Sequence, residues 1–379
     1  MVRALREHGV DARIVSSDDD VGGRLGVVRD RWVDHEGVPT YFIPRIRSRS
    51  HTLVGFTFSP GFIPWLWREI PRQDFVHVHT VFSFPANTAM AIARRRSKPY
   101  AVRPLGQLCS WSLEVRSPIK RLQLAAMGRR NIDGATFLHA TSQMEADEVG
   151  RLNFRCPIKV LPLGLRIPDQ AADRSNILRA ELNIPAGNRI ALFLSRIHVK
   201  KGLDTLLRAL GHSSTANINL VVCGDGEKKY VAELKRLANQ LGIASRVHWL
   251  GFVRGERKWE IARGSDFFVL PSYSENFGIA VLEALACGLF VIVSPHVGIS
   301  EELAQAGFAR LAPVEPMALA EAIASVSIGE RFDDDARRTR RAFIADRFSW
   351  DAAAHRLIAE YTKALHTLPS SPCAHPRLD

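Results

Sequence analysis

The chain has 379 residues, of which 46% are hydrophobic and 24% are charged. This composition is typical of globular proteins and excludes a wholly disordered, a collagen-like or a disulfide-scaffold protein, and the length predicts two ordinary domains. Of the formal net charge of +12, +9 lies in residues 1–170. A basic first half indicates a polyanionic partner, such as nucleic acid, an anionic membrane or a phosphorylated substrate, unless the charge serves solubility alone.

The cysteines and the N-terminal residues bear on the cellular compartment. The five cysteines are scattered without a CxxC pair, so we expect free thiols in a reducing cytosol and no zinc site. Residues 1–7 include Arg3, Arg6 and Glu7 and predict a charged helix, not the apolar run of a signal peptide. The uncharged stretch 50–67 contains two prolines and two glycines, which excludes one continuous membrane-spanning helix. We therefore expect a cytoplasmic protein, either soluble or peripheral at the inner face of the membrane.

The first half, taken in chain order, predicts an α/β domain. It opens in a helical pattern at 2–8, where such a domain normally opens with a buried strand and a glycine-rich turn. We therefore expect that first strand to be missing, either because the start codon was placed late or because the domain is reduced. The expected strands are 13–16, 40–44, 75–79, 100–103 and 136–140, and the expected helices are 86–95, 120–131 and 143–151.

The second half alternates more regularly. Residues 161–174 contain Pro162, Gly164 and Pro168 and predict a linker between domains. The expected strands are 190–195, 219–223, 246–250, 266–270 and 290–294, and the expected helices are 203–210, 228–241, 258–262 and 278–287. Short apolar strands that alternate with helices are typical of a doubly wound parallel sheet covered on both faces.

Two carboxylates eight residues apart form the strongest motif. Glu275 precedes the start of the helix predicted at 278–287, and Glu283 lies within it. The unpaired backbone N–H groups at such a helix start suit a diphosphate, and the two carboxylates can accept hydrogen bonds from the hydroxyls of a ribose and a donor sugar. The alternative is a helix-capping acid at Glu275 and a solvated acid at Glu283.

Arg196 and Lys201 form a second motif. They lie between the strand predicted at 190–195 and the helix predicted at 203–210, at the edge of the sheet where an open α/β domain binds ligands. A guanidinium fork and an ammonium group together suit a leaving diphosphate. Basic residues beside a helix start are also common without any ligand.

In order and spacing, these motifs resemble the nucleotide-binding domain of retaining GT-B glycosyltransferases of family 4, also called group 1, of the bacterial surface-polysaccharide type. Besides Arg196, Lys201-Gly202 and the two glutamates, the chain has a G-x-G at 224–226 and Gly-Ile-Ser-Glu at 298–301. The resemblance implies two Rossmann-like parallel-sheet domains facing across a cleft. It places an acceptor-side domain at 1–165, a nucleotide-sugar-binding domain at 166–347, a helix that crosses back at 348–366 and a disordered tail at 367–379.

The resemblance also implies a role for single residues. Arg196 and Lys201 would neutralise the diphosphate, Glu283 would bind the ribose, and Glu275 would hold the donor sugar; Arg196, Lys201 and Glu275 are the predicted catalytic residues. The rest of the predicted nucleotide-sugar site is Val253, beside the base, and Asn276, Phe277, Gly278 and Ile279, through their backbone. The chemistry would be positioning and charge stabilisation, with retention of configuration and without a metal or a cofactor.

On the acceptor side the chain departs from the family. Many members carry a histidine near the donor sugar, after the strand that corresponds to 100–103, whereas this chain has Pro104-Leu105-Gly106 there. We expect Arg103 or Gln107 to supply the polar group instead, and His79 to line the cleft.

Other patterns point less well to metal or dinucleotide chemistry. His77 and His79 alternate without a third ligand, so they are expected to be buried histidines at a strand end. The aspartate runs 18–20 and 333–335 match the DxD of metal-dependent glycosyltransferases, but solvated charge is the simpler interpretation. The G-x-G at 224–226 lacks the third glycine of a dinucleotide fingerprint.

The aromatic stretch 50–67 has four arginines at its flanks, a composition that suits a membrane interface or a lipid-linked acceptor. The alternative is a core helix with Trp65 and Trp67 packed inside. The basic run 94–98 can add to the same patch. Nucleic acid is not expected, because no recognised binding motif accompanies the charge.

The sequence thus predicts a metal-independent, retaining, hexosyltransferase-like glycosyltransferase. It would move a sugar from a nucleotide-diphosphate donor to a glycan, free or lipid-linked, in exopolysaccharide or lipopolysaccharide synthesis. Two alternatives stay open. One is a sugar-nucleotide phosphorylase or synthase on the same fold, and the other is a truncated, inactive homologue that binds only nucleotide or membrane.

Overall fold

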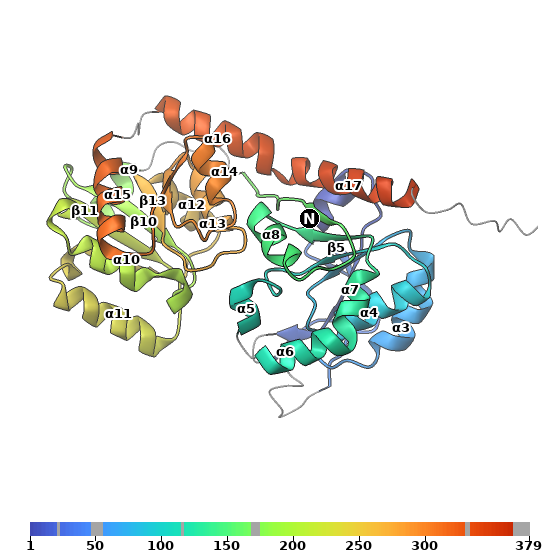
Figure 1. Ribbon diagram of the computed structural model, residues 1–379. Helices are drawn as coiled ribbons and strands as arrows, with labels where there is room; N and C mark the ends of the chain where they lie inside the picture. Colours follow the sequence, from blue (N-terminus) through green and yellow to red (C-terminus); the bar gives the residue numbers. More distant parts are fainter. Residues whose placement is uncertain (21–22, 47–55, 115–116, 168–174, 330–333, 367–379) are drawn as a thin grey trace, which may run out of the picture. The chain divides into compact units, whose positions relative to one another are not determined.

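The computed structural model describes residues 1–20, 23–46, 56–114, 117–167, 175–329 and 334–366 (Figure 1). The chain divides into two compact units. Unit 1 consists of Met1–Thr141, Glu145–Pro162 and Ala353–Asp379, and unit 2 consists of Ser142–Met144 and Leu163–Ala352. Both units contain a sheet of parallel strands together with helices, as the sequence predicts. The tail predicted at 367–379 lies outside the described residues.

Unit 2 contains a parallel sheet of six strands in the order β12-β11-β10-β13-β14-β15. The strands are β10 (Arg189–Leu194), β11 (Ile218–Cys223), β12 (Val247–Gly251), β13 (Phe267–Leu270), β14 (Phe290–Val293) and β15 (Ala309–Leu311). The order reverses between β10 and β13, which pair with each other although β11 and β12 separate them in the chain. In doubly wound domains, ligands bind at the carboxyl ends of the strands beside such a switch point.

The strands of unit 2 form because short runs of Val, Ile, Leu and Phe are buried on both faces. Every residue of β11, β13 and β14 is buried. The helices of this unit are α9 (Ser175–Glu181), α10 (Leu203–Leu210), α11 (Lys228–Gln240), α12 (Glu256–Arg263), α13 (Ile279–Ala286), α14 (Ser300–Gln305), α15 (Pro316–Gly329) and α16 (Asp334–Phe348). All strands and helices predicted at 190–294 are confirmed, with ends that differ by one or two residues.

The sheets of unit 1 are smaller. A parallel sheet has the order β6-β7-β8-β9, and a second sheet has the order β1-β5-β4. The strands are β1 (Ile14–Ser17), β4 (Trp32–His35), β5 (Val38–Ile43), β6 (Val76–His79), β7 (Tyr100–Arg103), β8 (Phe137–Ala140) and β9 (Ile158–Val160). A short antiparallel pair, β2 (Asp19–Asp20) and β3 (Gly23–Arg24), lies apart from both. Glu36 and Gly37, both with positive φ, connect β4 to β5, which is the backbone that a two-residue hairpin of type I′ requires.

The helices of unit 1 surround these sheets. They are α1 (Val2–Glu7), α3 (Phe62–Glu69), α4 (Phe84–Arg95), α5 (Ser110–Glu114), α6 (Ser117–Gln123), α7 (Arg129–Asp133), α8 (Gln143–Gly150) and α17 (Trp350–His366). A π-helical turn at Leu124–Gly128 joins α6 to α7, so the single helix predicted at 120–131 is interrupted. The long helix α17 begins in unit 2 and continues from Ala353 as part of unit 1.

The aromatic stretch predicted at 50–67 lies partly outside the described residues, and its second part forms α3. Trp65 is partly buried and packs against the core of unit 1, whereas Trp67 is 45% exposed. The core-helix alternative is therefore wrong for Trp67, because the residues that α3 buries are Phe62 and Leu66. Among the described helices, none combines the length and the apolar character that crossing a bilayer requires.

Candidate functional site

The loops that follow β10 and β13 bring the two predicted motifs of unit 2 together. The backbone N–H of Tyr273 donates a 2.8 Å hydrogen bond to the carbonyl oxygen of Lys200, and the Ser272 hydroxyl donates to the same oxygen at 3.0 Å. The two loops therefore hold each other at the switch point of the sheet. They position the cationic motif beside the carboxylate motif, although the residues are more than 70 positions apart in the chain.

Lys201 and Glu275 face each other in this arrangement. The Lys201 ammonium donates a hydrogen bond to Oε2 of Glu275, and the two side chains are 11% and 23% exposed. A partly buried ion pair is screened less by water than a surface pair, so each partner fixes the position of the other. The structure thus brings a predicted phosphate-binding cation and a predicted sugar-binding carboxylate into direct contact.

Gly202 explains why a glycine follows the lysine. Its backbone is left-handed, with φ of +66°, and a Cβ at this position would collide with the carbonyl oxygen of Pro271. Only glycine tolerates both conditions. The Lys-Gly pair therefore lets the loop after β10 approach the loop after β13 closely enough for Lys201 to reach Glu275.

The segment between the two glutamates starts helix α13. The N–H of Glu275 donates to the carbonyl of His296 at 2.9 Å, and its carbonyl accepts from Gly298 at 2.8 Å. Gly278, with φ of +103°, turns the chain into the helix. The first N–H groups of a helix have no partner within it, so Ile279 and Ala280 begin a positively polarised helix end that suits an anion.

The side chains of this segment take different positions. Phe277 is buried and packs against Phe348 in the core of unit 2, which leaves its backbone rather than its ring for a ligand. Ile279 is 46% exposed. Asn276 lies between Glu275 and Phe277 and is partly exposed.

Glu283 has a partner that sequence reasoning missed. The Lys258 ammonium, from α12, donates a 2.6 Å hydrogen bond to Oε1 of Glu283, and both side chains are mostly buried. Lys258 also lies over the ring of Trp259, 4.1 Å from its centroid. The alternative of a solvated acid at Glu283 does not fit this environment. No local pattern marks Lys258, because its contact with α13 is tertiary.

Arg196 and the segment at Val253 complete the predicted donor residues. Arg196 is exposed, and within the described part of the chain its guanidinium makes no ion pair, so it is available to an anion. Val253 is partly buried and packs against the core of unit 2, whereas the neighbouring Phe252 is 67% exposed. The exposed ring, rather than Val253, is the surface that this loop offers to a flat group such as a base.

The sequence matches two models of protein families. The model described as "Glycosyl transferases group 1" matches residues 175–343, and the model described as "Glycosyl transferase 4-like domain" matches residues 1–164. Between them, these matches span most of both units. The chain belongs to the group 1 glycosyl transferases.

Curated relatives match this family member over part of their length. The D-inositol 3-phosphate glycosyltransferase of Xylanimonas cellulosilytica is 31% identical over 249 residues, which are 62% of this chain and 58% of the relative. The protein of the same name from Corynebacterium jeikeium is 27% identical over 329 residues, which are 81% of this chain and 71% of the relative. This chain thus spans little more than half of the first relative.

Solved structures of several glycosyltransferases share the fold. Sucrose-phosphate synthase from Thermosynechococcus elongatus has a TM-score of 0.73 at 19% identity and covers 97% of this chain and 92% of its own. Anabaena HepE, solved with UDP and glucose, has a TM-score of 0.67 at 19% identity, and the match covers 88% of this chain and 87% of HepE. WaaG, a glycosyltransferase involved in lipopolysaccharide biosynthesis, has a TM-score of 0.67 at 17% identity, with 95% and 94% covered. The predicted GT-B fold is confirmed.

In unit 1 of this family member, two of the predicted acceptor-side residues are neighbours. His79 and Arg103 are register partners at the carboxyl ends of β6 and β7. Burial and the charge of Arg103 lower the pKa of His79 to about 4, so its imidazole is neutral at pH 7. Nε of Arg103 is buried without a hydrogen-bond partner. A buried donor of this kind is costly unless a ligand or water satisfies it.

Gln107 has a different position from the one its predicted role suggests. Its Oε1 accepts hydrogen bonds from the N–H of Val81 at 2.9 Å and of Phe82 at 3.3 Å. The amide oxygen therefore holds the loop between β6 and α4, and the side-chain NH₂ is the polar group left for an acceptor. Of the two residues expected to replace the missing histidine, Arg103 is the more buried and has an Nε without a hydrogen-bond partner, whereas Gln107 is partly exposed.

Glu145 organises the loop in which the family histidine is missing. This fully buried carboxylate accepts from the N–H of Gly106 at 2.9 Å, and from the N–H and the hydroxyl of Thr141 at 2.7 and 2.8 Å. The sequence could have indicated that Glu145 binds backbone N–H groups, because Ser142 and Glu145 have the spacing of a capping box at the start of α8.

The H-x-H pattern and the first aspartate run have structural roles. The Tyr361 hydroxyl lies 2.6 Å from Nδ1 of His77, and His139 donates to the carbonyl of Leu161 at 2.7 Å. His77 and His139 also lie 3.3 Å apart through Nε2 and Nδ1. For the run 18–20, the prediction of solvated charge is wrong at Asp18, which is fully buried because Arg24 and Arg29 pair with it at 3.4 Å.

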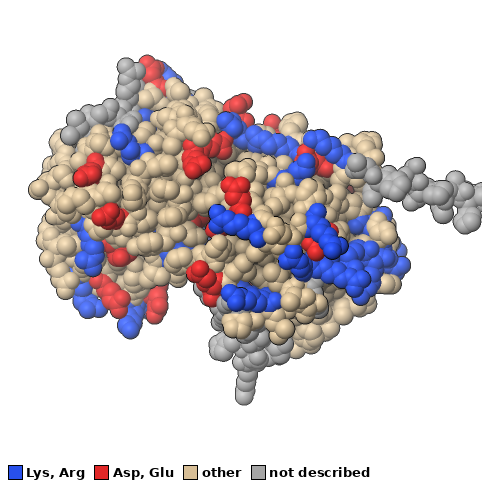
Figure 2. All heavy atoms as spheres, in the orientation of Figure 1, with Lys and Arg blue, Asp and Glu red and all other residues tan. Residues whose placement is uncertain are grey.

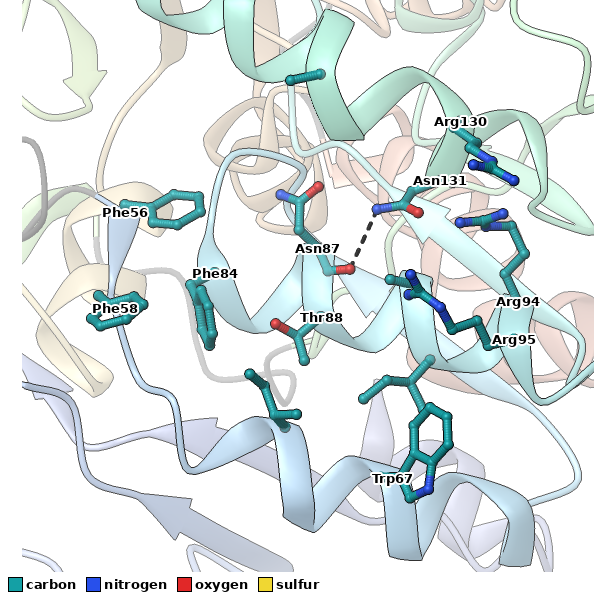
Figure 3. A pocket seen from close by; sticks show the side chains of 14 residues that line it. Phe56, Phe58, Trp67, Phe84, Asn87, Thr88, Arg94, Arg95, Arg130 and Asn131 are labelled. Carbon is teal, nitrogen blue, oxygen red and sulfur yellow. Dashed lines mark hydrogen bonds between the residues drawn. The ribbon is translucent and has the colours of Figure 1, made fainter.

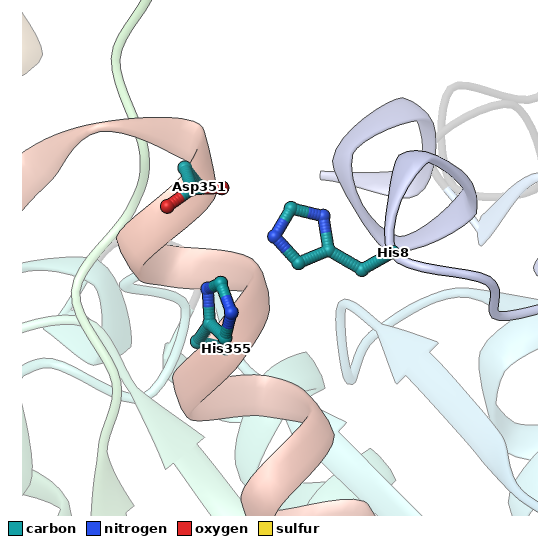
Figure 4. Close-up of side chains that lie close together, drawn as sticks. All are labelled: His8, Asp351 and His355. Carbon is teal, nitrogen blue, oxygen red and sulfur yellow. The ribbon is translucent and has the colours of Figure 1, made fainter.

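Among the described residues, one group combines three side chains of the kinds that bind divalent metals (Figure 4). Asp351 and His355 lie one turn apart on α17. The ring of His8, just after α1, packs edge to face on His355 with 4.4 Å between the centroids. None of the three belongs to the predicted donor or acceptor residues, so we assign the group no part in transfer.

Proposed function

We propose that this family member is a retaining glycosyltransferase that moves a sugar from a nucleoside-diphosphate donor to a glycan, without a metal ion. The observation that carries the proposal is the contact between Lys201 and Glu275 at the switch point of the unit 2 sheet. This contact supports the proposal because a cation that suits a leaving diphosphate lies against a carboxylate that suits sugar hydroxyls, at the edge of the sheet where such folds bind ligands.

The proposed reaction exchanges one C–O bond for another. The acceptor hydroxyl attacks the anomeric carbon from the face on which the diphosphate leaves, and the departing phosphate oxygen takes the hydroxyl proton. Arg196 and Lys201 stabilise the negative charge that develops on the diphosphate, together with the amides that begin α13. Glu275 accepts hydrogen bonds from donor-sugar hydroxyls, and Glu283, held by Lys258, accepts them from the ribose.

The relatives and fold neighbours guide the choice of substrates. HepE was solved with UDP and with UDP-glucose, so uridine nucleotide-sugars are the first donors to test. We propose a cell-surface glycan, carried on a lipid at the cytoplasmic face of the membrane, as the acceptor. The basic first half of the chain and the likeness to WaaG support this choice.

The test uses the full chain with UDP- and GDP-sugars. Calorimetry measures nucleotide binding, and NMR follows donor turnover and the anomeric configuration of the product, with and without EDTA. We expect turnover with retention that EDTA does not change. Lys201→Ala and Glu275→Gln should lower turnover by about 100-fold or more at an unchanged melting temperature, whereas Arg236→Ala, at an exposed position of α11, should behave as the wild type. Nucleotide binding without turnover of any donor would identify an inactive homologue instead.

A further inference from the structure

Unit 1 contains a pocket of about 550 Å³ beside helix α4 (Figure 3). Its walls come from α3, α4, α7 and the segment before α3. None of His79, Arg103 and Gln107 lines it, and the donor residues belong to unit 2. The pocket is therefore separate from the residues of the proposed transfer reaction, and a ligand in it would bind independently of that reaction.

One end of the pocket is aromatic. Phe56 and Phe58 both pack edge to face on Phe84, at the start of α4, with 5.9 and 4.9 Å between ring centroids. All three rings line the pocket and are partly exposed. Leaving such rings open to water costs free energy in proportion to their apolar area, so this end suits an apolar ligand.

The other end of the pocket is cationic. Arg94 and Arg95, in the last turn of α4, and Arg130 of α7 line it, and Figure 3 shows the three guanidinium groups gathered on one side. Within the described residues, none of the three makes an ion pair with a carboxylate. Nε of Arg94 is moreover buried without a hydrogen-bond partner. Three guanidinium groups without a carboxylate partner, one of which has a buried and unsatisfied Nε, indicate an anionic ligand group.

The wall of the pocket that α3 supplies has the composition of a membrane interface. Ile63 and Trp67, on the outer face of α3, are 49% and 45% exposed and line the pocket. The guanidinium of Arg96 lies 3.9 Å from the centroid of the Trp67 ring. Figure 2 shows basic side chains gathered over the part of unit 1 that carries α3, α4 and α7. Exposed indole rings beside basic side chains are favoured at the boundary between headgroups and acyl chains.

The separation of the two ends selects the class of ligand. Phe84 and Arg94 are ten residues apart on α4, which is about 15 Å along the helix axis. A nucleic acid would place phosphates and bases side by side along the whole pocket, and a free phosphate would leave the aromatic end empty. A molecule with one anionic group and one long apolar chain satisfies both ends.

We propose that this pocket binds one anionic phospholipid of a bilayer, with an acyl chain against Phe56, Phe58 and Phe84 and the phosphate among Arg94, Arg95 and Arg130. Binding would draw the lipid partly out of the bilayer and seat α3 at the membrane surface, with Ile63 and Trp67 among the headgroups. The positive charge of the arginines attracts the protein to an anionic membrane, and the acyl chain in the pocket slows its dissociation.

The first experiment measures sedimentation of the full chain with vesicles of phosphatidylcholine, alone or with phosphatidylglycerol. We expect binding to the mixed vesicles only. The triple variant Arg94→Gln/Arg95→Gln/Arg130→Gln should bind about 100-fold more weakly, because each basic residue near an anionic surface contributes about fivefold. The matched control is Arg31→Gln/Arg151→Gln/Arg155→Gln, which removes the same charge from exposed positions of unit 1. Equal losses in the two triple variants would overturn the proposal.

The second experiment tests whether a chain enters the pocket. Phosphatidylglycerol with brominated acyl chains should quench part of the tryptophan fluorescence, and Trp67→Phe should remove that part. Ala91→Trp, which fills the middle of the pocket, should weaken the part of vesicle binding that depends on an acyl chain. If Ala91→Trp does not fold, the quenching measured with Trp67→Phe still tests the proposal. Equal quenching with and without Trp67 would contradict a lipid occupant. A lipid occupant would also be contradicted if inorganic phosphate or single-stranded RNA, at equal charge, abolished the binding of the wild type to vesicles.

Discussion

The ammonium group of Lys258 and the carboxylate of Glu283 are joined by a 2.6 Å hydrogen bond between helices α12 and α13. Because Glu283 is the residue proposed to bind the ribose, Lys258 determines how that carboxylate is presented. One carboxylate oxygen is taken by the ammonium, and the other is left for a hydroxyl. Lys258 is thus a positioning residue, which acts on the nucleotide through Glu283 and not by direct contact.

Lys258→Ala is therefore expected to weaken donor binding more than catalysis. A hydrogen bond to a charged group contributes about 1.5–3 kcal/mol, so we expect KM for the donor to rise by about tenfold or more while kcat changes little. Steady-state kinetics with varied donor measure both constants. Lys258→Arg should restore most of the affinity. A fall in kcat at unchanged KM would show that Lys258 contributes to the chemical step instead.

Glu275→Gln is expected to affect the chemical step itself. The variant keeps the size of the side chain but removes the charge that faces Lys201, and with it the strongest acceptor for donor-sugar hydroxyls. Removing one preorganised electrostatic contact costs about 100- to 1,000-fold in kcat. Glu321→Gln, at an exposed position of α15, should leave kcat unchanged. Single-turnover measurement separates the chemical step from product release. A Glu275→Gln variant with normal turnover would remove Glu275 from the site.

Gly202→Ala is expected to destabilise unit 2, because the position combines a φ of +66° with a Cβ that would collide with the Pro271 carbonyl. Strain of this kind costs about 1–3 kcal/mol. Urea unfolding measures the loss of free energy of unfolding. Gly187→Ala is the matched control, because a Cβ there meets no atom within 4 Å. It should leave stability unchanged or slightly raised. Equal stability of the two variants would show that the loop relaxes without cost.

Five of the six strands of unit 2 could be predicted, because each is a short and mostly apolar run. The strands β15, β4 and β9 were missed, because their residues are mostly partly or fully exposed and show no such run. Arg196, Lys201 and Glu275 could be proposed from spacing and from the family resemblance. Lys258 and Glu145 could not be linked to the site in that way, because a contact such as Lys258–Glu283 depends on how two helices pack.

The histidines of unit 1 predict an acid limit to stability. Burial lowers the pKa of His79 to about 4 and that of His139 to about 3, against 6.5 for an exposed histidine. Between these values the unfolded chain binds protons that the folded chain does not, so the contribution is fully present above pH 6.5 and is lost as the pH falls toward 4. In that window each histidine lowers the free energy of unfolding by about 1.4 kcal/mol for each pH unit that the pH falls.

The test is urea unfolding between pH 7 and 4.5. The free energy of unfolding should depend less steeply on pH for His79→Gln than for the wild type, by the slope that corresponds to about one proton. His366→Gln, exposed near the end of α17, should keep the wild-type slope. Identical slopes in all three proteins would show that His79 titrates normally in the folded chain.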